Sequence, residues 1–310
     1  MKARRSLANA VKFYLDSRRQ LGFALKNGHW ALANFARYAR RIGHRGPLTS
    51  SLAVSWSAQS PSAPQRACRL NMVRRFARFW QAHDPATEVP TRGVLGPGYR
   101  RRPVHIYTPA QISSLLGATA LLGTEQPLRA ASLRTVLGLL ACTGMRVSEA
   151  LHLQRRDVDW HNRRLTLRQT KSGQPRIIVL QASTMAALRA YARLRQTTFP
   201  GAAPAAFFLS GTGRPLTYWI VRDGFLRLRR HLGWTGPPRP RLHDLRHTFA
   251  VRRLLDWSRR DQPIGHLILS LSAYLGHRQV TDTYWYFSAT PELLAVASRR
   301  FQSAAARLRL

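Results

Sequence analysis

Residues 243–250 read His-Asp-Leu-Arg-His-Thr-Phe-Ala, and this stretch carries more information than any other part of the chain. Positions three apart lie on one face of an α-helix, so His243 and Arg246 would face the same neighbour. A histidine can transfer a proton near neutral pH, whereas an arginine keeps its charge and can hold a phosphate through paired hydrogen bonds. The stretch therefore predicts a helix that places a proton-transferring group beside an anion-binding group.

Two further segments combine a glycine turn with a charged or titratable side chain. The segment TGMRVSEAL (143–151) breaks a helix at its glycine and presents Arg146, with Glu149 one turn later. The segment LGH ends at His277, and Tyr286 follows nine residues on. Both segments can bring reactive side chains close to a helix end.

Lysine is rare in this chain, which makes Lys171 informative. Only four of the 50 basic residues are lysines: Lys2, Lys12, Lys26 and Lys171. Arginine cannot release a proton near neutral pH, whereas a lysine can be tuned to do so. Lys171 lies in the segment TKSG (170–173), in the turn between two strand-like runs. It is therefore a candidate proton donor, although a surface lysine in a hairpin is the simpler explanation when the residue is taken alone.

Together these residue types suit attack on a phosphodiester. Two arginines can neutralise the non-bridging oxygens, a lysine can protonate the leaving oxygen, and a histidine can accept or relay the proton of the nucleophile. A tyrosine in a cationic pocket can be that nucleophile. Each element has an ordinary explanation: surface charge, helix capping, or core packing of the cluster 284–287. Their joint occurrence in this order is far less expected by chance.

Composition indicates a protein that binds a polyanion. The 310 residues include 50 Lys plus Arg against 13 Asp plus Glu, for a formal net charge of +37 at pH 7. The arginines are spread along the chain, which favours a folded protein clasping nucleic acid over a charged tail. We find no isolated basic amphipathic helix, no membrane-spanning run and no signal-peptide core. Cys68 and Cys142 are expected to be reduced core residues, and no Cys/His cluster has metal-ligand spacing, so we expect a cytoplasmic protein without metal or cofactor.

The chain is expected to be mainly α-helical, with a small antiparallel sheet (α+β). Residues 4 to about 82 read as helices, with Ser50 or Ser51 capping a short one. The helix from about Pro64 is expected to bury one face and to place arginines against DNA phosphates on the other: Arg66, Arg69, Arg74, Arg75 and Arg78. A linker rich in Pro, Gly and Arg follows, and Arg100, Arg101 and Arg102 suit a strap along a phosphate backbone.

A second domain is expected to open at Thr108, where Thr-Pro-Ala-Gln forms a capping box. Strand-like alternation predicts a three-stranded antiparallel sheet over 157–160, 165–170 and 175–180, with Lys171 in its second turn. Helices are expected near 109–117, 127–142, 182–196, 217–232, 243–258, 264–274, 280–287 and 291–306.

The chain resembles the tyrosine recombinases, the integrase group that includes the Xer enzymes. The resemblance rests on TGMRVSEAL, TKSG, HDLRHTFA, LGH and the tyrosine nine residues after that histidine, and it covers about residues 104–306. It implies a helical core-binding (SAM-like) DNA-binding domain over 1–90, a basic linker over 91–107 and a catalytic domain over 108–310. It also implies double-stranded DNA as partner, with a dimer on each site and a tetrameric synapse of this chain or of related recombinase subunits.

Carried over by position, the resemblance implies a role for each motif residue. Arg146 and Arg246 would bind the scissile phosphate, and Glu149 would orient Arg146. Lys171 would be the general acid. The remaining roles would fall to His243 in proton transfer, to His277 as a phosphate contact, and to Tyr286, which would form a 3′-phosphotyrosyl bond without ATP or metal.

The sequence departs from the family pattern near its end. The span from Arg246 to His277 is several residues longer than in Xer enzymes, and Tyr286-Phe287-Ser288 replaces the usual Tyr-x-His. Tyr284 competes for the role of nucleophile. Two positions apart on a helix, the two tyrosines would point about 200° apart, so only one can face the phosphate. The spacing from LGH favours Tyr286.

Other functions fit the sequence less well. A metal-dependent transposase or nuclease needs clustered carboxylates, which the 13 scattered acidic residues do not supply. A type IB topoisomerase shares the residue chemistry, and a catalytically silent DNA-binding relative would keep the fold alone. Among recombinases, the sequence favours a mobile-element enzyme of transposition or integration, with Xer-type chromosome or plasmid resolution as the alternative.

Overall fold

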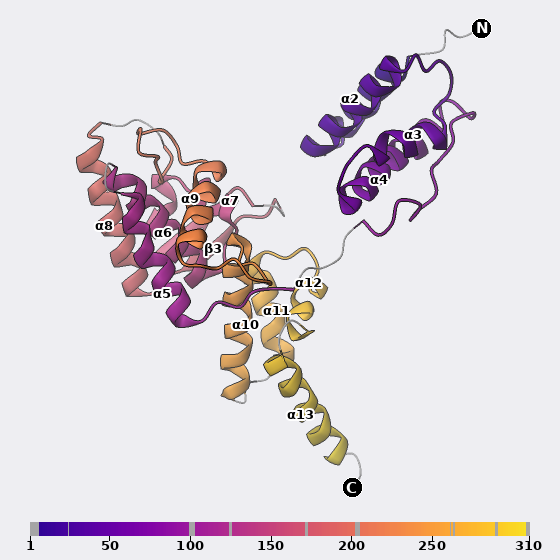
Figure 1. Ribbon diagram of the computed structural model, residues 1–310. Coiled ribbons are helices and arrows are strands. Elements are labelled where there is room, and N and C mark those ends of the chain that lie inside the picture. The colour runs from indigo at the N-terminus through magenta and orange to yellow at the C-terminus, as the bar shows by residue number, and fades with distance from the viewer. Residues whose placement is uncertain are drawn as a thin grey trace. The chain divides into compact units, whose positions relative to one another are not determined.

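The computed structural model describes residues 6–23, 25–98, 103–123, 126–170, 173–201, 205–260, 262, 264–288 and 291–307. The chain divides into two compact units, Met1–Arg102 and Pro103–Leu310 (Figure 1). Within the described residues, no helix is both long and apolar enough to span a bilayer.

Unit 1 is a group of four helices around a hydrophobic core. The helices are α1 (Leu7–Gln20), α2 (Lys26–Arg41), α3 (Ser50–Ala58) and α4 (Ala63–Trp80). Each helix buries one apolar stripe, and the rings of Phe35 and Trp56 meet edge to face, 5.3 Å apart, where α2 packs against α3. This packing of amphipathic faces is the main source of helix stability in a small domain.

Unit 2 contains more helices and the sheet. Its elements are α5 (Pro109–Ala118), η1 (Thr119–Leu122), α6 (Pro127–Thr143), α7 (Val147–Leu151), η2 (Arg155–Asp157), β1 (Val158–Asp159), β2 (Arg164–Leu167), β3 (Arg176–Val179), α8 (Ala182–Thr198), α9 (Tyr218–His231), α10 (Leu242–Arg259), α11 (Ile264–Leu275), α12 (Thr281–Tyr284), η3 (Trp285–Ser288) and α13 (Pro291–Arg307). The expected mainly helical fold with a small antiparallel sheet is confirmed.

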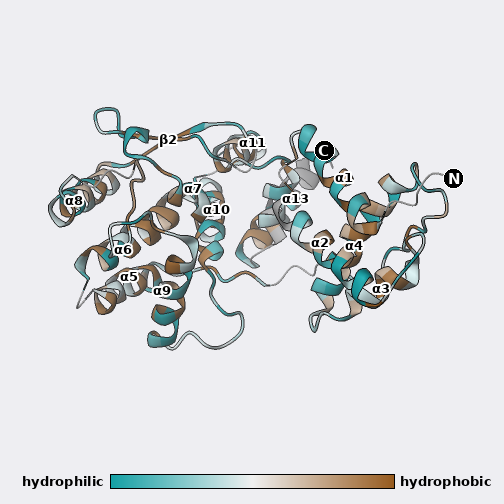
Figure 2. Ribbon diagram, turned by 90° about the horizontal axis from the view of Figure 1, so that it is seen from above, coloured by the Kyte–Doolittle hydropathy of each residue, from teal (hydrophilic) through white to brown (hydrophobic). Residues whose placement is uncertain are grey.

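Two hydrophobic clusters organise unit 2. The larger one surrounds α6, which packs against α5, α8 and α10. The smaller one joins α10 to α11, η3 and α13, and it includes the ring of Tyr286. Figure 2 shows hydrophobic and hydrophilic residues alternating along the helices, as expected for elements with one buried face. Because α10 contributes residues to both hydrophobic clusters, it connects them.

The sheet is antiparallel, in the order β1-β2-β3. Leu165 pairs with Ile178, and both side chains are buried in the larger cluster. Ile177 and Val179, on the opposite face of β3, are exposed. One face of the sheet therefore packs on the core, as the alternation in the sequence predicts.

Local signals set several helix ends. The predicted capping box is present: Thr108 Oγ1 accepts from the Gln111 amide at 3.1 Å, and Gln111 Oε1 accepts from the Thr108 amide at 2.9 Å. The prediction for α3 was wrong by one residue, because Thr49 is the N-cap and its hydroxyl accepts from the Leu52 amide.

Two expectations about side-chain burial were also wrong. Cys68 and Cys142 are free thiols, as expected, but both are exposed and neither is a core residue. Cys68 lies on the side of α4 opposite its buried stripe of Ala67, Leu70 and Val73. An apolar stretch of sequence does not determine which face of the helix a cysteine within it occupies.

Candidate active site

Two glycine turns form the frame of the site. Gly144 ends α6 with a φ of +63°, and a Cβ there would lie 2.5 Å from Cδ1 of Phe249. Gly276 follows α11 with a φ of +67°, and a Cβ there would lie 2.8 Å from Nη1 of Arg176. Only glycine fits both the left-handed backbone and the space. These turns aim the carbonyls of Gly144, Leu275 and Gly276 at arginine side chains.

Arg246 joins the two turns from α10. Its Nη1 donates to the Gly144 carbonyl at 2.8 Å, and its Nη2 donates to the Leu275 carbonyl at 2.8 Å. The residue is only 2% exposed. Burial, and then the nearby charge of Arg146, lower the pKa of Arg246 to about 10. The guanidinium therefore stays charged at neutral pH, and it can attract an anion to this part of the site.

Arg146 precedes α7 and is held by Glu149. Its Nη1 donates to Glu149 Oε1 at 2.9 Å, and its backbone amide donates to Oε2 at 2.8 Å. Its Nη2 donates to the Gly276 carbonyl at 2.9 Å. Arg146 and Arg246 thus bind carbonyls of the same turn, and the sequence expectation that they lie together agrees with this geometry.

Arg176 is a member of the site that the sequence analysis did not identify. It begins β3, and its Nη1 and Nη2 donate to the two oxygens of Glu149 at 2.9 and 2.6 Å. Burial of the Glu149 carboxyl favours its neutral form, but the hydrogen bonds and charges of Arg176 and Arg146 outweigh burial and lower the pKa of Glu149. The only sequence signal for Arg176 is a basic residue at the start of a strand.

Tyr286 lies beside these charged residues. The residue is 2% exposed, and its hydroxyl lies 3.2 Å from Nδ1 of His247. Burial raises the pKa of Tyr286, while the charge of Arg246 and a hydrogen bond from it act in the opposite direction. The phenol therefore remains protonated at neutral pH and needs an acceptor before it can act as a nucleophile.

His247 is the second residue that the sequence analysis missed, although it lies within HDLRHTFA. Burial, followed by the charge of neighbouring groups, lowers the pKa of His247 to about 3. Its ring meets the exposed His243 ring edge to face at 4.6 Å. His243 therefore lies one imidazole away from Tyr286. A neutral imidazole between the phenol and an exposed histidine can pass a proton from one to the other.

His277 also contacts the tyrosine. Its ring stacks with the Tyr286 ring at 6.2 Å, and its Nδ1 lies 2.7 Å from the hydroxyl of the buried Thr283. Burial and the charge of Arg246 lower the pKa of His277 to about 3. Tyr284, in contrast, is 52% exposed, and its ring contacts Phe287. Of the two tyrosines, Tyr286 is the one beside Arg246.

These residues form a strongly cationic site. Arg146 and Arg176 pair with one buried carboxylate, Glu149, and Arg246 lies nearby, so the three guanidiniums leave two positive charges to attract an anion. The hydrogen bonds of Arg146 and Arg246 to backbone carbonyls fix these two guanidinium planes without neutralising them. Preorganised donors of this kind stabilise charge that develops on a phosphoryl group.

Residues 106–292 match the sequence profile of the phage integrase family. The chain belongs to this family. The integrase/recombinase y4rB of Sinorhizobium fredii (strain NGR234) is 38% identical over 305 residues, which cover 94% of this chain and 96% of that protein. Tyrosine recombinase XerD of Mycobacterium tuberculosis (strain H37Rv) is 32% identical over 240 residues, covering 75% of this chain and 72% of that protein.

A solved structure shows the same fold. The Tn1549 transposon integrase in complex with transposon right end DNA matches with a TM-score of 0.70 and 18% identity, covering 96% of this chain and 99% of that one. The predicted family is therefore confirmed. As a tyrosine recombinase, the protein is a site-specific enzyme that breaks and rejoins DNA.

The structure does not describe every predicted residue of this phage integrase family member. Lys171, with Arg100, Arg101 and Arg102, lies outside the described residues. The arginines of α4 do not share one exposed face. Arg75 and Arg78 are exposed, but Arg69 lies over the Trp56 ring at 5.2 Å, Arg74 donates to the Pro90 carbonyl at 2.8 Å, and Arg66 is partly buried. Contact of these five arginines with DNA phosphates therefore stays a prediction, with Arg75 and Arg78 the most exposed of them.

Proposed function

We propose that this recombinase cuts and rejoins double-stranded DNA through a covalent 3′-phosphotyrosyl bond at Tyr286, and exchanges strands through a Holliday intermediate. The observation that carries the proposal is the contact of the Tyr286 hydroxyl with His247, directly beside the buried Arg246. A nucleophile, a proton acceptor and a phosphate-binding cation thus lie within one cluster of this chain. No second protomer is required to assemble them.

In the proposed reaction, Arg146 and Arg246 bind the non-bridging oxygens of the scissile phosphate. Glu149 and Arg176 are positioning residues, because they hold Arg146 without reaching the substrate themselves. The phosphate replaces backbone carbonyls as a partner for guanidinium donors. It also brings the negative charge that the site lacks, which strengthens the hydrogen bonds in a water-poor environment.

Cleavage removes one proton from Tyr286 and delivers another to the released 5′ oxygen. The Tyr286 oxygen forms a bond to phosphorus and gives its proton to His247, from which His243 can take it onward. The bond from phosphorus to the 5′ oxygen breaks, and Lys171 supplies the proton of the released 5′ hydroxyl. A bound phosphodiester favours the protonated imidazole and so raises the pKa of His247 from about 3. His277 donates a hydrogen bond to the phosphate.

The biological setting is proposed more broadly. We place the enzyme in the cytoplasm, acting for a mobile element, because integrase/recombinase y4rB and the Tn1549 integrase are its relatives by sequence and by fold. Residues 1–90 and 108–310 would hold DNA as core-binding and catalytic domains, with 91–107 as the linker. A dimer would occupy each site and four protomers the synapse, since exchange of two duplexes requires four strand cuts.

Covalent trapping tests the function directly. Duplexes tiled from the DNA that flanks the gene, nicked so that the cut fragment diffuses away, are incubated with the protein in EDTA. We expect a denaturant-resistant adduct that mass spectrometry maps to Tyr286. Salt-sensitive binding of every duplex without an adduct would contradict the proposal and favour a DNA-binding role alone.

Replacing His247 with phenylalanine tests the proton acceptor. The variant keeps a ring of similar shape but cannot accept a proton, so we expect single-turnover cleavage to slow by about 10²-fold or more, with DNA affinity unchanged. The exposed His161→Phe, in the turn after β1, is the matched control and should cleave normally.

A modified substrate separates the role of Lys171 as general acid from the role of His247 as proton acceptor. Sulfur in place of the leaving 5′ oxygen departs without protonation, so it should rescue Lys171→Ala and leave His247→Phe slow. Rescue of both variants to the same extent would contradict a role for His247 in accepting the proton. Thermal unfolding of His247→Phe checks that its core is intact.

A further inference from the structure

A second cationic site lies in unit 2, away from the active site. A cavity of about 1080 Å³ opens between α8 and the segments 154–160 and 205–207. Its lining includes five arginines: Arg155, Arg156, Arg189, Arg193 and Arg195. Figures 1 and 2 place α8 at one end of unit 2, apart from α11, which carries part of the active site. The tyrosine chemistry proposed above uses no residue of this pocket.

Arg195 is unusual because it occupies a core position of α8. The buried stripe of this helix is Met185, Leu188, Tyr191 and then Arg195. The Arg195 residue is 2% exposed, and its Nη2 donates to the Ala206 carbonyl at 3.3 Å. Burial and the charge of Arg155 both lower the pKa of Arg195. Arg195 therefore adds a buried guanidinium to the exposed arginines that line the pocket.

The other four arginines of the pocket have no acidic partner in the part of the chain that the structure describes. Among the described residues, Arg155, Arg156, Arg189 and Arg193 make no ion pair. The nearest acidic residues in the sequence are engaged elsewhere: Asp157 binds Arg168 at 2.7 Å, and Asp159 accepts from His161 and Asn162. The pocket therefore presents several guanidiniums to whatever enters it.

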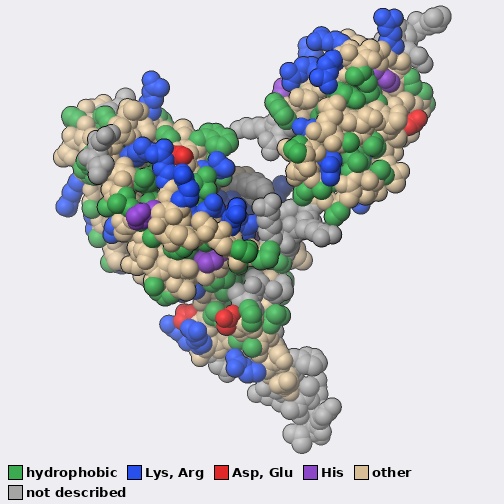
Figure 3. Space-filling view, viewed as in Figure 1, with side chains coloured by type: hydrophobic (Ala, Val, Ile, Leu, Met, Phe, Trp, Pro, Cys, Tyr) green, Lys and Arg blue, Asp and Glu red, His purple; other side chains and the backbone are tan. Residues whose placement is uncertain are grey.

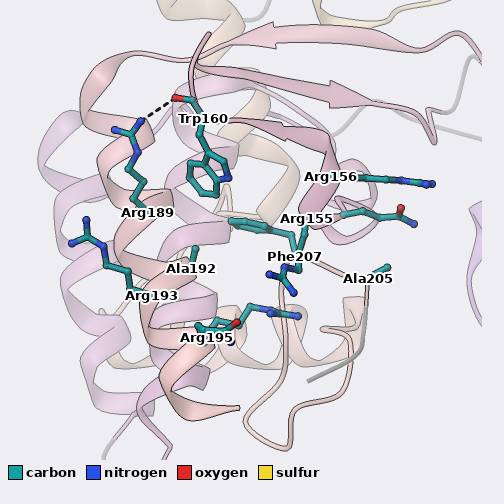
Figure 4. A pocket seen from close by; sticks show the side chains of 11 residues that line it. Arg155, Arg156, Trp160, Arg189, Ala192, Arg193, Arg195, Ala205 and Phe207 are labelled. Atoms are coloured by element: carbon teal, nitrogen blue, oxygen red, sulfur yellow. Dashed lines mark hydrogen bonds between the residues drawn. The ribbon is translucent and has the colours of Figure 1, made fainter. Parts of the chain in front are cut away.

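The pocket also has an aromatic wall. Figure 4 shows the rings of Trp160 and Phe207 lying between α8 and the segment of Arg155, while Arg156 extends outward. The two ring centroids are 6.3 Å apart, with Phe207 buried behind the partly exposed indole. Arg189 Nη2 donates to the Trp160 carbonyl at 2.9 Å, which fixes the segment that carries the indole.

The arrangement of these groups identifies the kind of ligand. Arg189 and Arg193 are one helical turn apart, about 6 Å, which is comparable with the separation of neighbouring phosphates in a single strand. Arginines beside an aromatic ring are the usual means of binding single-stranded nucleic acid, since phosphates pair with the guanidiniums and a base stacks on the ring. A second copy of this chain, with 13 acidic residues against 50 basic ones, is a poor partner for such a pocket.

We propose that the pocket beside α8 binds a short single-stranded stretch of nucleic acid, with one base against Trp160 and phosphates on Arg189, Arg193 and Arg155. The concave shape favours a flexible strand over the convex backbone of a duplex. This site adds to the proposed cleavage function and does not depend on Tyr286.

Photocrosslinking locates the ligand. The intact protein is mixed with an oligothymidylate of about eight nucleotides carrying one 5-iodouracil, irradiated, digested and mapped by mass spectrometry. We expect crosslinks on Trp160. Arg189→Ala/Arg193→Ala should weaken binding at least 10-fold and reduce the slope of log affinity against log salt by about 1.4, the value for two lost single-strand contacts.

The matched control removes two exposed arginines from α9 instead, as Arg222→Ala/Arg230→Ala. Equal weakening in both double variants would show attraction by net charge alone and would overturn the proposal. Crosslinks that avoid Trp160 would also overturn it, as would tighter binding of an acidic peptide of equal charge, which would indicate a protein partner. Adduct formation at the scissile site should be unchanged in the α8 variant, so failure of this proposal is distinguishable from failure of the cleavage function.

Discussion

Replacing Tyr286 with phenylalanine is expected to abolish covalent adducts and cleaved product, while affinity for the DNA site changes by less than about twofold. The substitution removes one hydroxyl from a ring that is 2% exposed and packed among α10, α11 and α13, so the fold should persist. His247 loses a hydrogen-bond partner, which costs about 1 kcal/mol of stability. The measurement is trapping on nicked duplexes, with binding followed separately by a mobility shift.

Tyr284→Phe is the matched control, because it removes the same atom two residues away. Tyr284 is 52% exposed, so we expect this variant to form adducts at the normal rate. Adducts that persist in Tyr286→Phe and disappear in Tyr284→Phe would transfer the nucleophile to Tyr284.

The local motifs predict most of the fold, because each depends on neighbours in the sequence. The capping box at Thr108 predicts the start of a helix, and the glycine after α6 predicts the end of one. Neither prediction depends on distant parts of the chain. The choice of Tyr286 over Tyr284 also follows from spacing. In the structure, the short turn after His277 buries Tyr286 and leaves Tyr284 in solvent, which supports Tyr286 as the proposed nucleophile.

Other features depend on contacts between distant residues and were not predictable from the sequence. Arg176 and Glu149 are 27 positions apart, and nothing in β3 indicates that its first residue reaches α7. His247 stood within a recognised motif, yet its contact with Tyr286 spans 39 positions. The arginines of α4 were assigned to one face because all are basic, but Arg69 and Arg74 have partners in unit 1.

Glu149→Gln is expected to have the second-largest effect, because it removes the carboxylate that pairs with both Arg146 and Arg176. The glutamine has nearly the same shape, but two guanidiniums are left without a counter-charge. Breaking one side of a buried ion pair costs about 3–5 kcal/mol of unfolding free energy. Cleavage should fall as well, since Arg146 is no longer held. The measurements are denaturant unfolding without DNA and single-turnover cleavage.

The pH dependence has a definite sign. The pKa of Glu149 is lowered in the folded protein, so its carboxylate stabilises the fold fully above about 4.5, the pKa of the unfolded chain. That contribution is lost as the pH falls through the lower folded value. The advantage of the wild type over Glu149→Gln should therefore be constant at neutral pH and shrink in acid. An advantage that grows with acid would contradict the role of the carboxylate.

Asp223→Asn provides the control for loss of one negative charge. Asp223 pairs with Arg227 at 3.0 Å, but both side chains are about half exposed, so its removal should cost less than about 1 kcal/mol. An equal loss of unfolding free energy in the two variants would show that Glu149 has no special position.

Binding of DNA gives a further test of Glu149→Gln. The scissile phosphate supplies part of the negative charge that this variant lacks, so DNA should raise the stability of the variant more than that of the wild type. That difference would place the phosphate at Arg146 by thermodynamic linkage alone.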